Sequence, residues 1–283
     1  RARPDIKTTV AFLTTRVSKP DEDDWSKLKR VLKYLKGTMY LKLTLSVGDG
    51  LFIIKWWVDA SFGVHWDSKG HTGMMMSLGK GAVMSFSRKQ KLNTRSSTES
   101  ELVGIDDAIG EIMWGLFFMQ AQGYDVARNI LLQDNKSTIL LATNGRFSSS
   151  KRTKHIHNRY FLVKDKVDRG EIEVEYEPTT RMWSDVLTKP KQGVAFREFR
   201  GHLMDCPTDY DDEVERRNTH PKLLPKDEGE KVISEKDRLV LRNAITMLLV
   251  YRSMKRKTKG SSSHHRSVLG EQQLGVRRKG RIQ

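Results

Sequence analysis

Residues 51–59 constrain the fold more than any other stretch, because this short and mostly apolar run ends in an acid. The run, LFIIKWWVD, is rich in β-branched and aromatic residues and is bounded by glycines at positions 48, 50 and 63. These features predict a β-strand, and its nearly continuous apolar character predicts burial on both faces in the middle of a sheet. A carboxylate at the end of a buried strand is costly unless cations or hydrogen-bond donors receive it. Asp59 therefore requires partners from elsewhere in the chain.

Strands and helices follow this run in a mixed α/β order. Runs 71–79 and 82–88, joined at a glycine-bracketed turn, extend the first strand into an antiparallel meander. A buried strand at 129–133 leads into a helix and then a strand at 172–176, an order that predicts parallel pairing. Helical patterns cover residues 5–36, with an interruption at 17–20, and residues 96–122, where residues 96–98 can cap the helix. Further helical patterns cover 135–142, 160–169 and 195–204, a short helix holds Asp185, and an alternating stretch at 41–47 predicts a half-exposed strand leading into the first.

The charge of the chain favours a polyanionic partner. Its 283 residues carry a formal net charge of +16, and a basic surface gains affinity for nucleic acid by displacing phosphate counterions. Much of that charge lies in residues 251–283, which hold ten Lys/Arg against one Glu. Hydrophobic residues make up 37% of the chain and charged residues 30%, which predicts a core accompanied by a polar, loosely folded portion.

Cysteine usage and the lack of long apolar runs exclude several classes of protein. Cys206 is the only cysteine, so the chain has no internal disulfide and no thiolate metal site, which fits a reducing intracellular setting. No stretch approaches the length of a membrane span, and residues 1–20 lack a signal-peptide core. The chain begins without Met, which suggests a piece of a longer translation product.

Four acids occupy positions where a cluster could form. Taken singly, each has a simpler explanation, such as a turn residue, a helix-start charge, an N-cap or a solvated helix acid. Their order along the chain, strand end, helix start, strand end and short helix, favours convergence instead. Like charges at close range repel, so such a cluster persists around bound cations, and oxygen-only ligation selects Mg²⁺ or Mn²⁺. The four acids are Asp59, Glu101, Asp134 and Asp185.

Several short motifs carry a family resemblance. They are VDA at 58–60, GKGAVMS at 79–85, SRKQ at 87–90, SSTESEL at 96–102, DN at 134–135, RTKHI at 152–156, RY at 159–160 and DVLTKP at 185–190. Together they resemble the ribonuclease H domain of copia-type LTR retrotransposon Pol polyproteins. Residues 1–40 resemble the end of the reverse transcriptase that precedes this domain. Departures from the family pattern at Ser61 and His157 allow for a copy that is drifting.

The resemblance implies a fold and a ligand set. The fold would be a mixed α/β ribonuclease H-like fold, with a five-stranded mixed sheet, the first three strands antiparallel, and helices on both faces. The four acids would hold two Mg²⁺ ions, with Mn²⁺ as a possible substitute, and two such ions can activate a water and stabilise the leaving oxygen of a phosphodiester. Glu99 is the rival of Glu101, because positions 99 and 101 lie about 200° apart on a helix and only one can face the site. The Glu-Leu pair at 101–102 favours Glu101.

Substrate contacts are expected in the basic stretch 146–159, which carries five Lys/Arg and no acid. A solvated basic loop is the alternative explanation of this stretch. An RNA–DNA hybrid would be recognised by its shape, its backbone and its 2′-hydroxyl groups. The candidate substrate-binding residues are Arg152, Lys154, His155 and Arg159.

The function implied is metal-dependent endonucleolytic cleavage of the RNA strand of RNA–DNA hybrids during reverse transcription. The partners would be the hybrid and the remainder of the Pol polyprotein, including its reverse transcriptase, with no membrane association, in a cytoplasmic virus-like particle. The main alternative is a catalytically inactive, nucleic-acid-binding remnant of such a polyprotein. A host protein that binds nucleic acid through its basic tail is a weaker alternative.

Four segments are expected along the chain. Residues 1–40 would be the helical remnant of the reverse transcriptase, and 41–205 the ribonuclease H-like domain. Residues 206–251 would be a charged extension with a possible helix, because 205–237 hold eleven acids against six Lys/Arg. Residues 252–283 would be a basic, disordered tail.

Overall fold

The computed structural model describes residues 2–48, 50, 52–144 and 157–208, with only the backbone of 157–160. The chain divides into two compact units, Arg1–Lys231 and Val232–Gln283, and everything below concerns the first. The expectations for the tail, for most of the charged extension and for the basic stretch before residue 157 lie outside the described residues. None of the described helices is long and apolar enough to cross a membrane.

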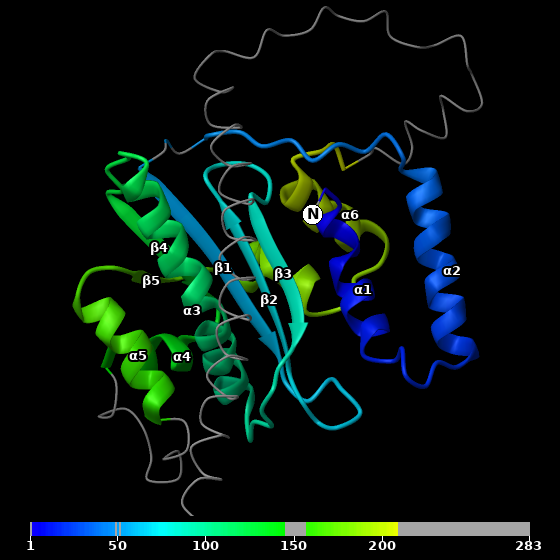
Figure 1. Cartoon of the computed structure of the whole chain (residues 1–283), viewed down its shortest axis with the longest axis horizontal. Coiled ribbons are helices and arrows are strands. Elements are labelled where there is room, and N and C mark those ends of the chain that lie inside the picture. Colours follow the sequence, from blue (N-terminus) through cyan, green and yellow to red (C-terminus); the bar gives the residue numbers. More distant parts are fainter. Residues whose placement is uncertain (1, 49, 51, 145–156, 209–283) are drawn as a thin grey trace, which may run out of the picture. The chain divides into compact units, whose positions relative to one another are not determined.

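Five strands form one mixed sheet in the order β3-β2-β1-β4-β5 (Figure 1). Strand β1 (Ile53–Ser61) pairs antiparallel with β2 (His71–Ser77), which pairs antiparallel with β3 (Met84–Lys89). On its other side β1 pairs parallel with β4 (Arg128–Gln133), and β4 pairs parallel with β5 (Glu173–Tyr176). The predicted fold class, with five strands and the first three antiparallel, is confirmed.

Burial on both faces of β1 explains its apolar sequence. Ile54, Trp56 and Val58 are fully buried on one face, and Trp57 is buried on the other. The indole Nε1 of Trp56 donates a hydrogen bond to Asn129 Oδ1 on β4, at 2.7 Å, which satisfies its polar atom. The prediction of a central strand is therefore confirmed.

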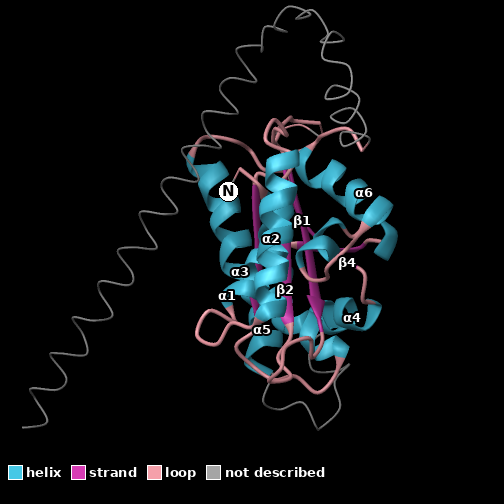
Figure 2. Ribbon diagram, turned by 90° about the vertical axis from the view of Figure 1, so that its right-hand side faces the viewer, coloured by secondary structure: helices cyan, strands magenta, loops and turns pink. Residues whose placement is uncertain are grey.

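Helices cover both faces of the sheet, as predicted (Figures 1 and 2). Helix α3 (Ser97–Ala121) packs along β1 and β2, and α4 (Lys136–Asn144) and α5 (His157–Asp168) pack against α3. On the opposite face, side chains of β1, β2 and β4 form a core with the short helix η5 (Trp183–Leu187) and with α6 (Gly193–Met204). This arrangement sets α3 and η5 on opposite sides of the end of β1.

The prediction of a strand over 41–47 is wrong. That segment forms only one isolated bridge, from Ser46 to Lys80 in the turn after β2. Two other backbone donors of the segment are bonded: Thr44 N donates to the carbonyl of Met204 at the end of α6, at 2.9 Å, and Leu41 N donates to the carbonyl of Thr38, at 3.2 Å. The alternating apolar residues therefore reflect packing against the turn after β2 and the end of α6. Neither of these is a strand that could form a β-ladder with the segment.

The predicted helical region 5–36 consists of a short 3-10 helix (Pro4–Ile6), α1 (Lys7–Thr14) and α2 (Glu22–Gly37). The interruption at Pro20 lies where the sequence predicts it. Asp21 begins α2 with a capping box, in which Asp21 Oδ1 accepts from Asp24 N at 2.9 Å and Asp24 Oδ2 accepts from Asp21 N at 3.1 Å.

Helix α1 packs onto the sheet and onto η5. Thr8 Oγ1 donates to the carbonyl of Val186 at 2.5 Å, and the ring of Phe12 stacks on the rings of His65 and His71, with centroids 4.7 and 4.6 Å away. His71 in turn contacts His65 through ring nitrogens at 3.0 Å and Ser87 Oγ at 2.7 Å. Residues 1–40 thus pack onto 41–205, and the boundary between them stays a prediction.

This contact gives the stability a pH dependence. Burial, and then the nearby His65, lower the pKa of His71 from 6.5 to about 3. Between these values the unfolded chain binds a proton at His71 that the folded chain does not, so stability falls as the pH falls below 6.5. We expect the free energy of unfolding of the wild type, relative to His71→Gln, to decrease by up to about 1.4 kcal/mol per pH unit below 6.5.

Urea unfolding of the wild type and of His71→Gln at several pH values checks this expectation. Taking the difference between the two proteins removes the contributions of titrating groups distant from His71, because both proteins retain them. A difference that is constant with pH would contradict the placement of His71 in this contact.

Candidate metal centre

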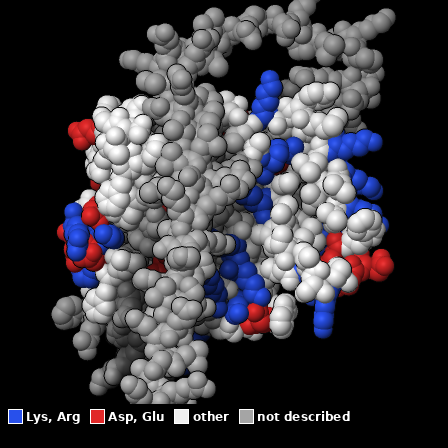
Figure 3. All heavy atoms as spheres, viewed as in Figure 1, with Lys and Arg blue, Asp and Glu red and all other residues white. Residues whose placement is uncertain are grey.

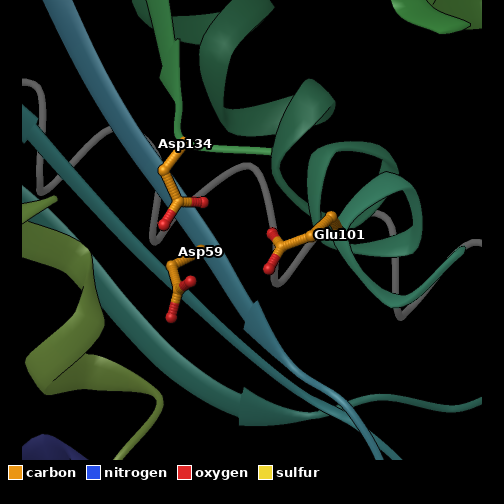
Figure 4. Close-up of side chains that lie close together, drawn as sticks. All are labelled: Asp59, Glu101 and Asp134. Carbon is orange, nitrogen blue, oxygen red and sulfur yellow. The ribbon is translucent and has the colours of Figure 1, made fainter. Parts of the chain in front are cut away.

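Three carboxylates meet at one end of the sheet (Figure 4). Oxygen atoms of Asp59, Glu101 and Asp134 all lie within 4.8 Å of one another. Strand pairing explains part of this convergence, because β1 and β4 run parallel with Trp57 opposite Leu132. Their carboxyl ends therefore reach the same edge of the sheet, and Asp59 and Asp134 follow two residues later. The third acid, Glu101, comes from the N-terminal part of α3, a helix that packs along β1 and β2.

Close packing of α3 on β1 brings Glu101 to the strand. A side chain at Gly104 would place its Cβ 3.1 Å from that of Ala60, so this glycine allows the helix to approach closely. Glu101 is itself buried, and its Oε2 accepts hydrogen bonds from Ala60 N at 3.0 Å and from Gln133 Nε2 at 3.3 Å. These donors hold the carboxylate toward the other two acids.

Glu99, the rival residue, has a different place. Its Oε2 accepts a hydrogen bond from Arg95 N at 2.7 Å, while its own backbone N donates to Ser96 Oγ at 3.2 Å. The predicted cap at Ser96 is present, and the Glu99 carboxylate satisfies a backbone donor directly before it. Glu99 is outside the three-acid cluster.

Asp185 is also outside that cluster, although it is buried nearby on η5. Lys189 Nζ donates to its Oδ1 at 2.6 Å, and Lys191 Nζ pairs with its Oδ2. The same Lys189 Nζ lies 3.8 Å from Asp59 Oδ2, an oxygen that also accepts a hydrogen bond from Thr188 Oγ1. The fourth acid is therefore linked to the other three through Lys189.

Sequence reasoning missed four residues that organise these acids. Gln133 donates to Glu101 and, through its Oε1, accepts from the backbone N of Asp134 at 2.8 Å. An amide at the end of a buried strand, directly before an acid, was the available signal for Gln133. For the other three the signal was the DVLTKP motif, which also contains Asp185, together with the lysine that directly follows the motif. These three residues are Thr188, Lys189 and Lys191.

Burial dominates the electrostatics of the cluster. It raises the pKa of Asp59 to about 6, although Lys189 and the Thr188 hydroxyl act against this shift. Burial, and then the charges of Asp59 and Asp134, raise the pKa of Glu101 well above its ordinary value. For Asp185 burial is outweighed by the hydrogen bonds from Lys189 and Lys191, which lower its pKa. The negative charges of Asp59 and Glu101 are thus incompletely compensated by nearby positive charge, whereas that of Asp185 is compensated by two lysines.

The donor set fits a hard divalent cation. Among the described residues, the donor set consists of carboxylate oxygens and includes no histidine or cysteine. Hard cations prefer oxygen ligands of this kind. Asp59 and Glu101, the two acids whose burial disfavours the charged form, would gain most from a bound positive charge.

The predicted substrate-binding residues cannot be placed in the same way. Arg152, Lys154 and His155 lie outside the described residues, and Arg159 falls in α5 where only the backbone is described. Their role therefore stays a prediction. On the face in view, Lys and Arg side chains form several groups, some of them beside acids (Figure 3). Arg128 pairs with both Glu173 and Glu175 across β4 and β5.

Comparison with known proteins identifies relatives among transposon polyproteins. No model of a known protein family matches the chain. The retrovirus-related Pol polyprotein from transposon RE2 of Arabidopsis thaliana is 32% identical over 199 residues, 70% of this chain. The corresponding polyprotein from transposon TNT 1-94 of Nicotiana tabacum is 30% identical over 188 residues, 66% of this chain. The chain spans only 14% of the length of each of these relatives.

Solved structures give a weaker likeness. Ribonuclease H1 from the halophilic archaeon Halobacterium salinarum aligns with 48% of this chain and 93% of its own, at 10% identity and a TM-score of 0.34. At that score the fold assignment depends on the strand order and pairing of the sheet described above.

Proposed function

We propose that this chain, which is related to a segment of the retrovirus-related Pol polyproteins of transposons, is a metal-dependent ribonuclease H that cleaves the RNA strand of RNA–DNA hybrids. One observation carries the proposal. Three carboxylates from β1, α3 and the end of β4 lie within 4.8 Å of one another, although 75 positions separate the first from the last. Nothing in local secondary structure requires these like charges, two of them buried, to meet, and a cation-binding role explains why they do.

The residues of the cluster would divide the work as follows. Asp59, Glu101 and Asp134 hold divalent cations, Mg²⁺ or Mn²⁺ from the oxygen-only donor set, and Asp185 joins them as the fourth ligand. Two bound cations supply charge for the attacking water and for the leaving oxygen of the phosphodiester.

Two neighbours would orient these ligands. Gln133 fixes the orientation of Glu101 through its amide, and the Thr188 hydroxyl fixes that of Asp59. Each neighbour contacts only one of the two carboxylate oxygens of its acid. The other oxygen of Glu101 and of Asp59 therefore stays available to bind a cation.

The similarity to transposon polyproteins supports a proposal for the substrate and partners. The hybrid would arise during reverse transcription of the element inside a virus-like particle, and the rest of the polyprotein, including its reverse transcriptase, would be the partner. Residues 1–40 would be the end of that reverse transcriptase and 41–205 the nuclease domain, with 206–251 a charged extension and 252–283 a basic tail. Arg152, Lys154, His155 and Arg159 would contact the backbone of the hybrid.

The test is cleavage of a labelled RNA strand in four contexts. We expect Mg²⁺-dependent cleavage when the strand is paired with DNA. We expect no cleavage of the single strand, of an RNA duplex, or of the hybrid in the presence of EDTA. A protein that binds the hybrid without cleaving it would instead be the inactive remnant, the second candidate, and the departures at Ser61 and His157 are the observations that favour that outcome.

A further inference from the structure

The side chain of Lys189 lies between two acids that belong to different elements. Its Nζ is 2.6 Å from Asp185 Oδ1 on η5 and 3.8 Å from Asp59 Oδ2 on β1. Both carboxylates are almost fully buried, with side chains 3% and 2% exposed, whereas the Lys189 side chain is 47% exposed. The lysine thus reaches its two partners from the solvent side of the cluster.

Lys189 provides the positive charge that Asp59 and Asp185 have in common. Within the described part of the chain, Asp59 forms an ion pair with Lys189 alone, and Glu101 and Asp134 form none. The charge of Lys189 also reaches Glu101. Lys191 differs, because its ion pair is with the other oxygen of Asp185, Oδ2, and does not include Asp59.

The oxygens that Lys189 contacts are the ones a divalent cation would use. Asp59 Oδ2 and Asp185 Oδ1 face the same ammonium group, so a cation placed between these two acids would occupy the same volume with twice the charge. Two positive charges a few ångströms apart repel each other strongly in a partly buried site. The lysine and the cation therefore compete for the same carboxylates.

We propose that Lys189 is an internal counter-cation of the acidic cluster, which competes with divalent cations for Asp59 and Asp185 and thereby sets the cation concentration at which the site fills. This inference rests on the proposed function, because it concerns the cations that the nuclease would use. The half-exposed side chain gives the ammonium group a path into solvent when a cation takes its place. Asp185 then leaves its lysine partner and joins the other three acids.

The effect on cation affinity distinguishes this role from that of a simple structural clamp. A clamp would hold Asp185 in place, and its removal would loosen the position of Asp185 and weaken cation binding. A competitor has the opposite effect on cation binding, because its removal frees two carboxylates. The sign of the change in cation affinity therefore separates the two roles.

Mn²⁺ binding, measured by isothermal titration calorimetry on the full chain, tests the inference. Lys189→Met keeps the length of the side chain and removes its charge, and Lys189→Gln is a second neutral variant. We expect both to bind Mn²⁺ about tenfold more tightly than the wild type or better, since 1.4 kcal/mol of relieved repulsion is a factor of ten. Lys189→Arg retains the charge and should bind Mn²⁺ as the wild type does.

A matched control is available on α5. Lys164 forms the same kind of pair with the residue four positions later, Asp168, at 2.7 Å, but takes no part in the cluster. Lys164→Met should leave Mn²⁺ affinity unchanged. Thermal unfolding in EDTA should show a lower midpoint for Lys189→Met than for the wild type, because Asp59 loses its one described ion pair.

The outcomes separate the inference from the proposed function. Equal or weaker Mn²⁺ binding by both neutral variants, in a wild type that cleaves hybrids, overturns the competition and leaves the nuclease intact. Tighter binding by the neutral variants in a wild type that cleaves nothing supports the competition and overturns the nuclease. Absence of Mn²⁺ binding in the wild type and in every variant overturns both.

Discussion

Replacing Asp59 with asparagine is expected to reduce Mg²⁺-dependent hybrid cleavage by about three orders of magnitude or more. Asp59 is 2% exposed and lies within 4.8 Å of both Glu101 and Asp134, so it would contribute to holding any cation in the cluster. A neutral amide is a poor substitute for a carboxylate, and cation stabilisation of the transition state is worth several kcal/mol. Each 1.36 kcal/mol corresponds to about a factor of ten in rate.

The same substitution is expected to stabilise the protein in EDTA at neutral pH. The pKa of Asp59 is raised from 3.8 to about 6, so the folded protein binds a proton at this site more readily than the unfolded chain does. Stability contributed by Asp59 therefore falls as the pH rises from 3.8 through 6, and the charged form is unfavourable above that range. Asparagine carries no charge and avoids this cost.

Cleavage assays and thermal unfolding in EDTA check both expectations on one variant. Asp168→Asn, which removes an exposed acid from α5, is the control and should change neither measurement appreciably. Hybrid cleavage that survives in Asp59→Asn would show that the catalytic site lies elsewhere. A large loss of stability in Asp59→Asn would mean that the carboxylate serves a structural purpose.

Adding a single methyl group at Gly73 is expected to be the most disruptive small change in the sheet. Gly73 lies opposite Asp59 in the pairing of β1 with β2, and η5 packs directly over it. A Cβ at this position would lie 2.7 Å from Leu187 Cβ, 2.8 Å from Thr188 Cγ2 and 2.9 Å from the carbonyl oxygen of Ser184. Overpacking of this kind costs about 1–3 kcal/mol.

Function should be lost together with stability in Gly73→Ala. The displaced segment holds Thr188, which donates to Asp59, and the nearby Lys189 and Asp185. Urea unfolding should show the lower stability, and the cleavage assay a reduced rate. Gly110→Ala is the matched control, because a Cβ there meets nothing within 4 Å in the middle of α3. It should raise stability by up to about 1 kcal/mol, since alanine favours the helix. Equal stability of the two variants would contradict the placement of η5 on β2.

Local patterns in the sequence determined most of the elements. The apolar run before Asp59 predicted the buried central strand, and the polar cap at Ser96 predicted the start of α3. These signals succeed because they depend on neighbours within a few positions, through side-chain alternation in strands and capping at helix ends. The alternation at 41–47 is the exception, because the predicted strand does not form. Alternation indicates that every second residue is buried, but it does not identify the element that buries these residues.

Only the tertiary structure decided how the acids are arranged. The sequence alone placed acids at strand ends and at a helix start, and the choice between Glu99 and Glu101 depended on resemblance and helix geometry. Packing brought Glu101 beside Ala60 and left Glu99 in the cap.

Asp185 forms ion pairs with Lys189 and Lys191, and packing places Lys189 beside Asp59 as well. The distance between Asp59 and Lys189 joins residues more than 100 positions apart and depends on how η5 docks on one face of the sheet, whereas the pairs of Asp185 with Lys189 and Lys191 are local in sequence. Periodicity along the chain cannot predict such a distance, because it depends on how side chains of different elements pack together.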